Sequence, residues 1–449
     1  MATSTRAFLV ELYEEHLEEA SFLYEQRRTL FANAEISWKK IGEFEERLEA
    51  HIDGLIVGGK LALEVCARHA AEGDFGELFA ATCVFCRQDR RDLVLATLDQ
   101  LDPDDRRKSG AIADALKYEL PDAWVPDLLT LLASGDPKLA PILARAFGYR
   151  RLPSGPQLLS AMKRCASSDL PEVVWALGRV AYEPSRAVLL DYLHSEEESV
   201  RSAAAVALER MGEPRAVDYC IEQARSHTWP IMPLGLAGGR NELALITELV
   251  QKNGGADCVT AIGLLGDPAS VPLLISQLEV PDTGAAAAIA LQCLTGAGLD
   301  ETVFVPDEID EDELFESERE QLKQGIKPTR GDGRPFGSTV TRLSQNAEDW
   351  KKWWTVNEML FTPGVWYRNG GPASPRRLVE VLLADNTPRK LRGLCLEELV
   401  VRYGKDLGIE IDTPVSRQTA PLAEALAWSH AEGSRFSEGY WYFGCQQSR

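Results

Sequence analysis

The sequence predicts an all-α protein, an α-solenoid of stacked helical hairpins with an N-terminal helical cap and a smaller, mostly helical C-terminal domain. Short amphipathic helical patterns follow one another with turn residues at near-regular spacing, and 45% of the 449 residues are hydrophobic, which is enough for a large core. We expect four parts: a helical cap over 1–60, the repeat solenoid over 61–299, an acidic and then Gly- and Pro-containing linker over 300–344, and a helical domain over 345–449.

The repeat is most visible over residues 170–296. The segments EPSRAVLLDYL, EPRAVDYCIEQ and DPASVPLLISQL each begin with an acidic residue followed by proline, at Pro184, Pro214 and Pro268. NELALITELV, from Asn241, falls between the last two, which gives steps of 30, 27 and 27 residues. Proline suits the first helical turn, where its missing N–H would have no partner, and the acid before it can cap the exposed amides. Each segment is therefore predicted to open a helix.

Alanine-rich second helices lie between these segments, as in SVRSAAAVALERMG and GAAAAIALQCLTG. Alanine favours helix and lets neighbouring backbones approach closely. Gly178, Gly212, Gly266 and Gly296 stand where these helices are predicted to end. A helical hairpin of this kind cannot cover its own apolar face, so it must stack on its neighbours.

The segments LGDPASVPLLISQL and EEESVRSAAAVALERMGEPRAV resemble HEAT-like repeats of the shorter bacterial kind, which also occur in phycobilisome lyases. The resemblance is clear over about one third of the chain and weaker over 60–170. It implies that an arginine at the position of Arg201 supports the turn between helices. The structural repeat positions that we expect are Pro184, Arg201, Gly212, Pro214, Gly266, Asp267 and Pro268.

Both flanks of the repeat differ from it. Near the N-terminus apolar side chains share one helical face while glutamates occupy the other, as a capping helix requires. Residues 300–320 contain eleven acids and one arginine, and like charges at that density favour a solvated linker, or an arm that contacts basic residues of a partner or of this chain. Six of the ten tryptophans lie in 345–449. The residues of the N-terminal apolar face are Leu9, Tyr13, Leu17, Ala20, Leu23 and Tyr24.

No assembled catalytic, cofactor-binding or metal-ligating set is found, so we expect no cofactor. Gly54 to Lys60 fits GxxxxGK, but Leu61 replaces the Ser or Thr that would hold magnesium and no strand precedes it. Cys83 and Cys86 form a CxxC pair inside a helical pattern, with no second pair to complete a zinc site. The six histidines are dispersed.

The C-terminal part carries the candidate partner-binding residues. Three tryptophans recur at i, i+3 and i+4, a stripe that either anchors its helix to its own domain or forms a contact for another protein. The aromatic tail GYWYFG poses the same two alternatives. The candidates are Trp350, Trp353, Trp354, Trp366, Trp441, Arg389, Lys390 and Arg392.

The composition favours a protein partner over other classes. With 69 acidic and 48 basic residues the net charge is −21, which opposes binding to nucleic acid and makes a helical-repeat DNA glycosylase a poor interpretation. No apolar run is long enough to span a membrane and the start of the chain lacks the pattern of a signal peptide, so a cytoplasmic location is expected. These features predict a non-catalytic protein-binding scaffold.

Two resemblances imply more specific functions, which differ from each other. The segments EEHLEEASFLYEQRR and WKKWWTVNEMLFTPGVWYRNGGP resemble a bacterial family of HEAT-like repeat proteins that is often encoded with type VI secretion genes and has no established catalytic residues. That resemblance implies an adaptor or chaperone for a secreted effector. The alternative is an enzyme of the chromophore-lyase kind, which would use Cys83 or Cys86 if either thiol were exposed.

Overall fold

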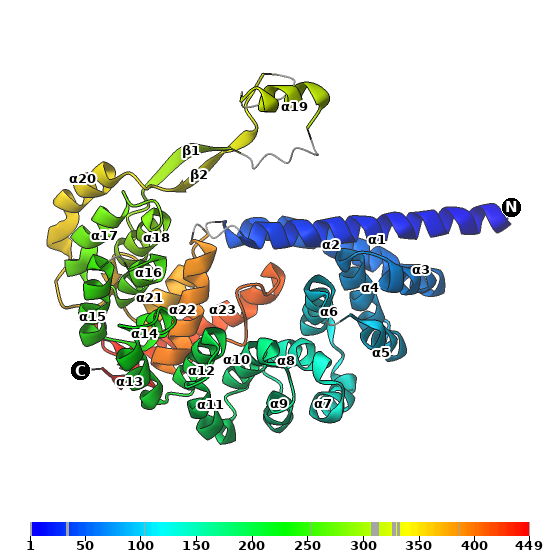
Figure 1. The fold of residues 1–449 in the computed structure, drawn as a ribbon, viewed down its shortest axis with the longest axis horizontal. Helices are drawn as coiled ribbons and strands as arrows, with labels where there is room; N and C mark the ends of the chain where they lie inside the picture. Colours follow the sequence, from blue (N-terminus) through cyan, green and yellow to red (C-terminus); the bar gives the residue numbers. More distant parts are fainter. Residues whose placement is uncertain are drawn as a thin grey trace.

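A computed structural model describes residues 2–32, 36–102, 104–252, 254–306, 314–325, 329, 333–385 and 387–448. Within these residues the chain forms twenty-three α-helices and three two-stranded antiparallel ribbons. The predicted all-α class is confirmed. Figure 1 shows that most of the helices follow one another along a curved array, which begins beside the N-terminal helices and ends beside the longest β-ribbon.

The array has an inner and an outer row of helices (Figure 1). Each inner helix contacts the next inner helix, and most outer helices pack against the inner helix that follows them in the chain. The inner row is α4 (Phe75–Arg87), α6 (Arg106–Glu119), α8 (Ala140–Tyr149), α10 (Leu170–Val180), α12 (Glu198–Arg210), α14 (Ile231–Ala237), α16 (Ala256–Leu265) and α18 (Gly284–Thr295). The outer row is α5 (Arg91–Gln100), α7 (Val125–Ser134), α9 (Gly155–Met162), α11 (Arg186–Tyr192), α13 (Pro214–Gln223), α15 (Arg240–Gln251) and α17 (Val271–Gln277).

The acid–proline pairs open outer helices, as the repeat predicts. Pro214 is the first residue of α13, and the Glu213 carboxylate accepts a hydrogen bond from the Arg215 amide at 3.2 Å. Pro184 and Pro268 lie in single 3₁₀ turns that lead directly into α11 and α17. The Asp267 carboxylate accepts from the Ala269 amide at 3.0 Å. Glu183 forms no such cap and accepts from the Arg186 side chain instead. The two caps satisfy amide groups that have no partner inside the helix.

Glycines end three inner helices, whereas a fourth has another role. Gly212, Gly266 and Gly296 adopt φ angles of 68°, 58° and 61° directly after or close to the ends of α12, α16 and α18. Gly178 was expected to end a helix, but it lies inside α10, so that prediction is wrong. A Cβ atom at Gly178 would lie 2.7 Å from the Cα atom of Ala207. The missing side chain therefore lets α10 approach α12 closely.

Three helices precede the array: α1 (Ala2–Ala32), α2 (Trp38–Val57) and α3 (Gly59–Glu72). Helix α1 packs against α2 and α4. Tyr24 of α1 is buried, stacks on Phe79 of α4 with ring centroids 3.9 Å apart, and donates a hydrogen bond to Asp114 of α6 at 2.8 Å. The GxxxxGK segment forms the turn between α2 and α3, without a preceding strand.

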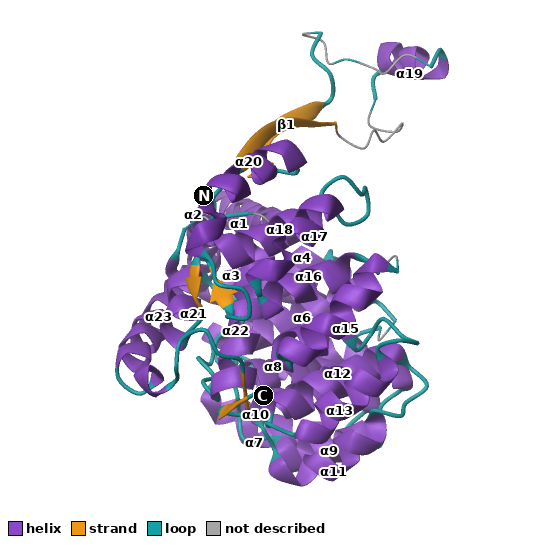
Figure 2. Ribbon diagram, turned by 90° about the vertical axis from the view of Figure 1, so that its left-hand side faces the viewer, coloured by secondary structure: helices purple, strands orange, loops and turns teal. Residues whose placement is uncertain are grey.

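The region predicted to be a linker contains an antiparallel β-ribbon that projects away from the array (Figures 1 and 2). Strand β1 (Asp300–Pro306) pairs with β2 (Gly337–Leu343), and α19 (Glu316–Lys323) lies near the tip. Val303 pairs with Val340 in this register, and β-branched residues of this kind favour extended backbone. Residues 307–313, which hold much of the acidic run, lie outside the described residues.

The four C-terminal helices are α20 (Ala347–Asn357), α21 (Pro375–Leu383), α22 (Arg389–Tyr403) and α23 (Val415–His430), with the short ribbons β3–β4 (Tyr367–Arg368, Gly371–Pro372) and β5–β6 (Tyr442–Phe443, Gln446–Gln447). Of these helices, α21, α22 and α23 lie inside the curve of the array in Figure 1 and towards one side of it in Figure 2, whereas α20 lies outside the curve, beside α17. Helix α22 contacts α12 and α14, while α23 contacts α2. One continuous apolar core therefore extends through the N-terminal helices, the array and the C-terminal helices.

Candidate functional site

A fully buried ionic group joins the C-terminal helices to the inner row. Arg368, Glu398 and Arg402 have no exposed side-chain surface. One guanidinium nitrogen of Arg368 donates to both oxygens of Glu398 at 2.8 Å, and Arg402 Nε donates to the same carboxylate at 3.1 Å. Burial lowers the pKa of Arg402, because a charged group is costly away from water.

The same two arginines reach the ends of inner helices. Arg368 donates to the carbonyl oxygens of Gly263 and Leu264 at 3.1 and 2.8 Å, at the end of α16. Arg402 donates to the carbonyl oxygen of Gly235 at 3.1 Å, at the end of α14. The last carbonyl groups of a helix have no partner in the helix and carry partial negative charge, so a cation placed there is stabilising.

Three of the tryptophans predicted to bind a partner are buried and bonded within this chain. Trp366 and Trp441 donate through Nε1 to the carbonyl oxygens of Leu264 and Leu265 at 2.9 and 2.8 Å. Trp350 donates to the carbonyl oxygen of Ser344 at 2.8 Å. These indoles hold the C-terminal part against α16 and hold α20 in place.

The other candidates lie at different depths. Trp353 and Trp354 are half-buried on α20, and Arg389 and Lys390 are half-buried at the start of α22. Arg392 is only 1% exposed and donates to Gln418 at 2.8 Å; burial lowers the pKa of Arg392 to about 10. The structure does not gather the eight candidates on one surface, and a partner-binding role for them stays a prediction.

Four acidic residues of the C-terminal part contact basic residues from several repeats, and they are here called the acidic segment: Glu397, Asp406, Glu410 and Asp412. Arg210 of α12 donates to Glu397 at 2.7 Å and to Asp406 at 2.6 Å. Arg179 of α10 donates to Glu397 and Glu410. Burial opposes ionisation of Glu397, but the two arginines outweigh it and lower its pKa. Further along, Arg151, Lys117 and Arg27 contact Asp406, Asp412 and the Asp412 carbonyl oxygen, respectively.

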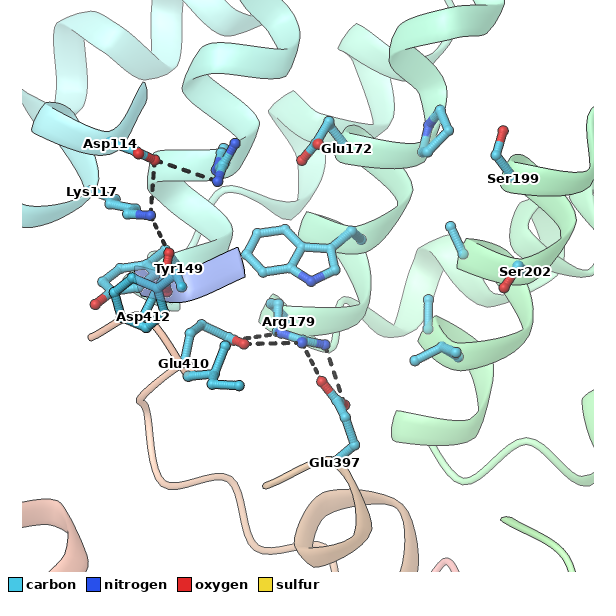
Figure 3. A pocket seen from close by; sticks show the side chains of 18 of the residues that line it. Asp114, Lys117, Tyr149, Glu172, Arg179, Ser199, Ser202, Glu397, Glu410 and Asp412 are labelled. Carbon is cyan, nitrogen blue, oxygen red and sulfur yellow. Dashed lines mark hydrogen bonds and ion pairs between the residues drawn. The ribbon is translucent and has the colours of Figure 1, made fainter. Parts of the chain in front are cut away.

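A cleft of about 950 Å³ lies beside this acidic segment. Its walls come from the end of α1, from α6, α8, α10 and α12, and from the C-terminal part, so no single repeat builds it. Figure 3 shows Asp114, Lys117 and Asp412 on one side of it and Arg179 with Glu397 and Glu410 on another. Its further charged and aromatic residues include Arg28, Arg145, Glu172, Arg389, Phe31 and Trp175.

Ion pairing differs among the basic residues of the cleft. Lys117 and Arg179 are buried and each is paired with two carboxylates. Arg145 lies 3.4 Å from Asp114 and is 37% exposed. Arg28 and Arg389 have aromatic rings as their neighbours, and within the described part of the chain neither has a carboxylate within 4 Å. Arg28 and Arg389 of the cleft thus have no ion-pair partner among the residues that the structure describes.

The two cysteines considered for covalent chemistry are in the interior. Cys83 and Cys86 of α4 are 1% and 2% exposed, and burial raises the pKa of both thiols, for Cys86 to about 12. Little reactive thiolate forms under those conditions. In the described ranges, no three His, Cys, Asp or Glu side chains are grouped as a metal site requires.

The sequence does not predict two features of the structure. The cleft residues Arg28, Arg145 and Trp175 come from α1, α8 and α10 and share no local motif, so only the stacking of helices brings them to one place. The second feature is a group of exposed apolar residues at and just after the end of α20, where helical periodicity favours burial of apolar side chains. Val356, Met359 and Leu360 are 75%, 86% and 68% exposed.

A model of HEAT repeats matches residues 155–232, which extend from the start of α9 to the start of α14. The prediction of HEAT-like repeats is confirmed for this segment. Among curated proteins no match to the chain was found. Over the residues that the structure describes, no helix has the length and apolar character needed to cross a membrane.

Proposed function

We propose that this chain is a protein-binding scaffold, an α-solenoid whose C-terminal domain and inner helices together hold a segment of another protein. The observation that carries the proposal is the cleft of about 950 Å³ between the inner row, α1 and the acidic C-terminal segment. HEAT-like hairpins commonly create extended concave surfaces for protein ligands, and residues 155–232 match such repeats.

The chemistry of the cleft supports a protein ligand. Trp175 and Phe31 offer apolar faces, while Arg28, Arg145 and Glu172 offer polar groups around them. Aromatic residues and arginine are enriched in protein interfaces, where an apolar centre is surrounded by a polar rim. The enzyme alternative loses its main support, because both thiols that it would use are buried.

Site-specific crosslinking tests the proposal. A photoreactive amino acid replaces Ser202, a half-buried residue of α12 that lines the cleft, in the full chain inside its own cells. The matched control carries it in place of Arg225, beyond α13, whose side chain is 61% exposed. We expect a discrete crosslinked protein with the Ser202 variant and none of the same mass with the control. Equal crosslinking from both positions, or none from Ser202, would contradict the proposal.

The flanking segments support a narrower role as an adaptor or chaperone for a secreted effector in the cytoplasm. Their resemblance to a family encoded with type VI secretion genes supports this role, and a scaffold with a cleft suits an adaptor. Co-expression with candidate effectors encoded beside the gene, followed by gel filtration, tests it. Co-elution of one effector is the expected result. Separation of every candidate would contradict the secretion role and leave the scaffold role to the crosslinking experiment.

A further inference from the structure

Three arginines of the cleft are available to a ligand: Arg28, Arg145 and Arg389, here called the basic strip. The Arg28 guanidinium lies over Phe75 and Tyr24, 5.1 and 5.8 Å from the ring centroids. The Arg389 guanidinium lies 5.3 Å from the centroid of Phe31. Its Nε atom is buried without a hydrogen-bond partner among the described residues. A buried donor without an acceptor reduces the stability of the fold, and a ligand acceptor that reaches it removes this penalty.

Direct contacts place the basic strip along one wall of the cleft. Tyr24 lies beneath Arg28 and donates to Asp114, which in turn lies 3.4 Å from Arg145. Phe31, one helical turn beyond Arg28, lies under Arg389. The three guanidinium groups come from α1, α8 and α22, so the strip exists only in the folded chain.

Contacts within this chain show how carboxylates bind to basic residues in and beside the cleft. The acidic segment lies against basic residues of three inner helices: Arg210 of α12, Arg179 of α10 and Lys117 of α6. Each of these side chains is paired with a carboxylate from the C-terminal part. Arg145 of α8 extends the same series, and its closest carboxylate, Asp114, already accepts from Tyr24 and pairs with Lys117.

We propose that the basic strip binds an acidic, extended segment of the protein partner, with carboxylates on Arg28, Arg145 and Arg389 and an apolar side chain against Phe31 or Trp175. This inference rests on the proposed scaffold function and names the chemistry of its ligand. Guanidinium groups bind carboxylates through strong, charge-assisted hydrogen bonds. The net charge of −21 repels every anion at long range, and the repulsion grows with the charge of the ligand. Three arginines therefore favour a peptide with a few carboxylates over a nucleic acid, which carries a phosphate at every nucleotide.

The test uses the full chain and a defined probe. The probe is a fluorescein-labelled peptide of alternating glutamate and serine with one central tyrosine, blocked at both ends, and fluorescence anisotropy measures its Kd. The matched peptide has lysine in place of every glutamate. We expect saturable binding of the acidic peptide only, weaker at higher salt. Arg28→Gln and Arg389→Gln should each raise the Kd about tenfold.

The controls separate recognition from folding. Arg225→Gln, on the outer surface, should leave the Kd unchanged. Arg28 is exposed and has no carboxylate partner among the described residues, so Arg28→Gln should retain the melting temperature even if Arg389→Gln does not. Free glutarate should not displace the peptide at equal concentration; if it does, the strip is a site for small dicarboxylates and the inference is wrong.

Two further outcomes would overturn the inference. One is equal binding of the lysine peptide and the glutamate peptide. The other is a failure of the acidic peptide to bind while the Ser202 crosslink still captures a partner. In the second case the scaffold function stands and only the acidic chemistry of its ligand is refuted.

Discussion

Glu398 accepts hydrogen bonds on both of its carboxylate oxygens from a single guanidinium nitrogen of Arg368, at 2.8 Å each, and neither side chain is exposed. Arg368 belongs to the β3–β4 ribbon and Glu398 to α22, and the arginine also reaches the end of α16. The pair therefore links three separate parts of the chain. The pair stabilises the fold only when both side chains are present, because a buried charge without its partner is strongly destabilising.

Removal of the carboxylate should strongly destabilise the fold. Glu398→Ala leaves Arg368 and Arg402 buried without their shared partner, and we expect a loss of about 3–5 kcal/mol in the free energy of unfolding. Urea denaturation followed by circular dichroism measures it. Glu248→Ala, which removes an exposed ion pair on α15, is the control and should change little. Equal effects of the two substitutions would show that the buried group is not important for stability.

A side chain at Gly178 should separate two inner helices. Gly178→Ala places a methyl group 2.7 Å from the Cα atom of Ala207, and overpacking of this kind costs about 1–3 kcal/mol. Gly110→Ala is the control, since Gly110 lies inside α6 with open space around it. Alanine there should stabilise the protein by about 0.5–1 kcal/mol. Thermal unfolding should give shifts of opposite sign, and a stabilised Gly178→Ala variant would contradict the close approach.

Acidification should weaken the contact between the C-terminal segment and α6. Burial opposes ionisation of Asp412, but Lys117 and Arg27 outweigh it and lower the pKa of Asp412 to about 2. A carboxyl pKa below its unfolded value of about 3.9 contributes stability above that pH, and the contribution is lost as the pH falls towards 2. Asp412→Asn should therefore lower stability at pH 6 by about 2 kcal/mol and have little effect at pH 2.

Denaturant titrations at several pH values measure this dependence. Asp122→Asn serves as the control, because the Asp122 side chain is 87% exposed beside Arg150. We expect the control to follow the unsubstituted protein at every pH. If the difference in stability between Asp412→Asn and the unsubstituted protein is the same at pH 6 and pH 2, the pKa of Asp412 is not lowered in the folded state.

Thiol labelling should distinguish surface from interior cysteines. Cys165 and Cys445 are partly exposed, whereas the other seven cysteines are buried. A disulfide reagent such as Ellman's should react quickly with at most these two in the native state and with all nine after denaturation. Mass spectrometry of the labelled peptides identifies the sites. Fast native labelling of Cys83 or Cys86 would restore the enzyme alternative.

The repeat was predictable because its signals are local. An acid followed by proline, as at Glu213 and Pro214, defines a helix start within two residues, and Gly212 defines the preceding helix end. Gly178 has no such local meaning: its neighbours cannot show that Ala207, one repeat further, packs against it. The β1–β2 ribbon is not predicted, although Thr302 to Val305 and Thr339 to Thr341 favour strands, because the dense acidic run and the glycines and prolines between these segments are typical of a linker.

The cleft could not be predicted, since its residues are distant in sequence. Arg28 and Arg389 line the same cleft from opposite ends of the chain, and neither belongs to a motif. The sequence makes Trp366 and Trp441 candidates for partner binding, but in the structure their indole N–H groups donate to carbonyl oxygens at the end of α16. A buried hydrogen bond to a remote backbone atom leaves no trace in the spacing of residues.

The hydrogen bond of 2.6 Å from Arg27 to the Asp412 carbonyl oxygen constrains how the protein matures. During translation, α1 emerges from the ribosome long before residue 412 is synthesised. Arg27 therefore cannot form this hydrogen bond until the C-terminal part has been made. The repeats can stack progressively in the meantime, because neighbouring hairpins are close in sequence. The nascent chain can therefore pass through a stage in which the array is assembled but the cleft still lacks its C-terminal wall.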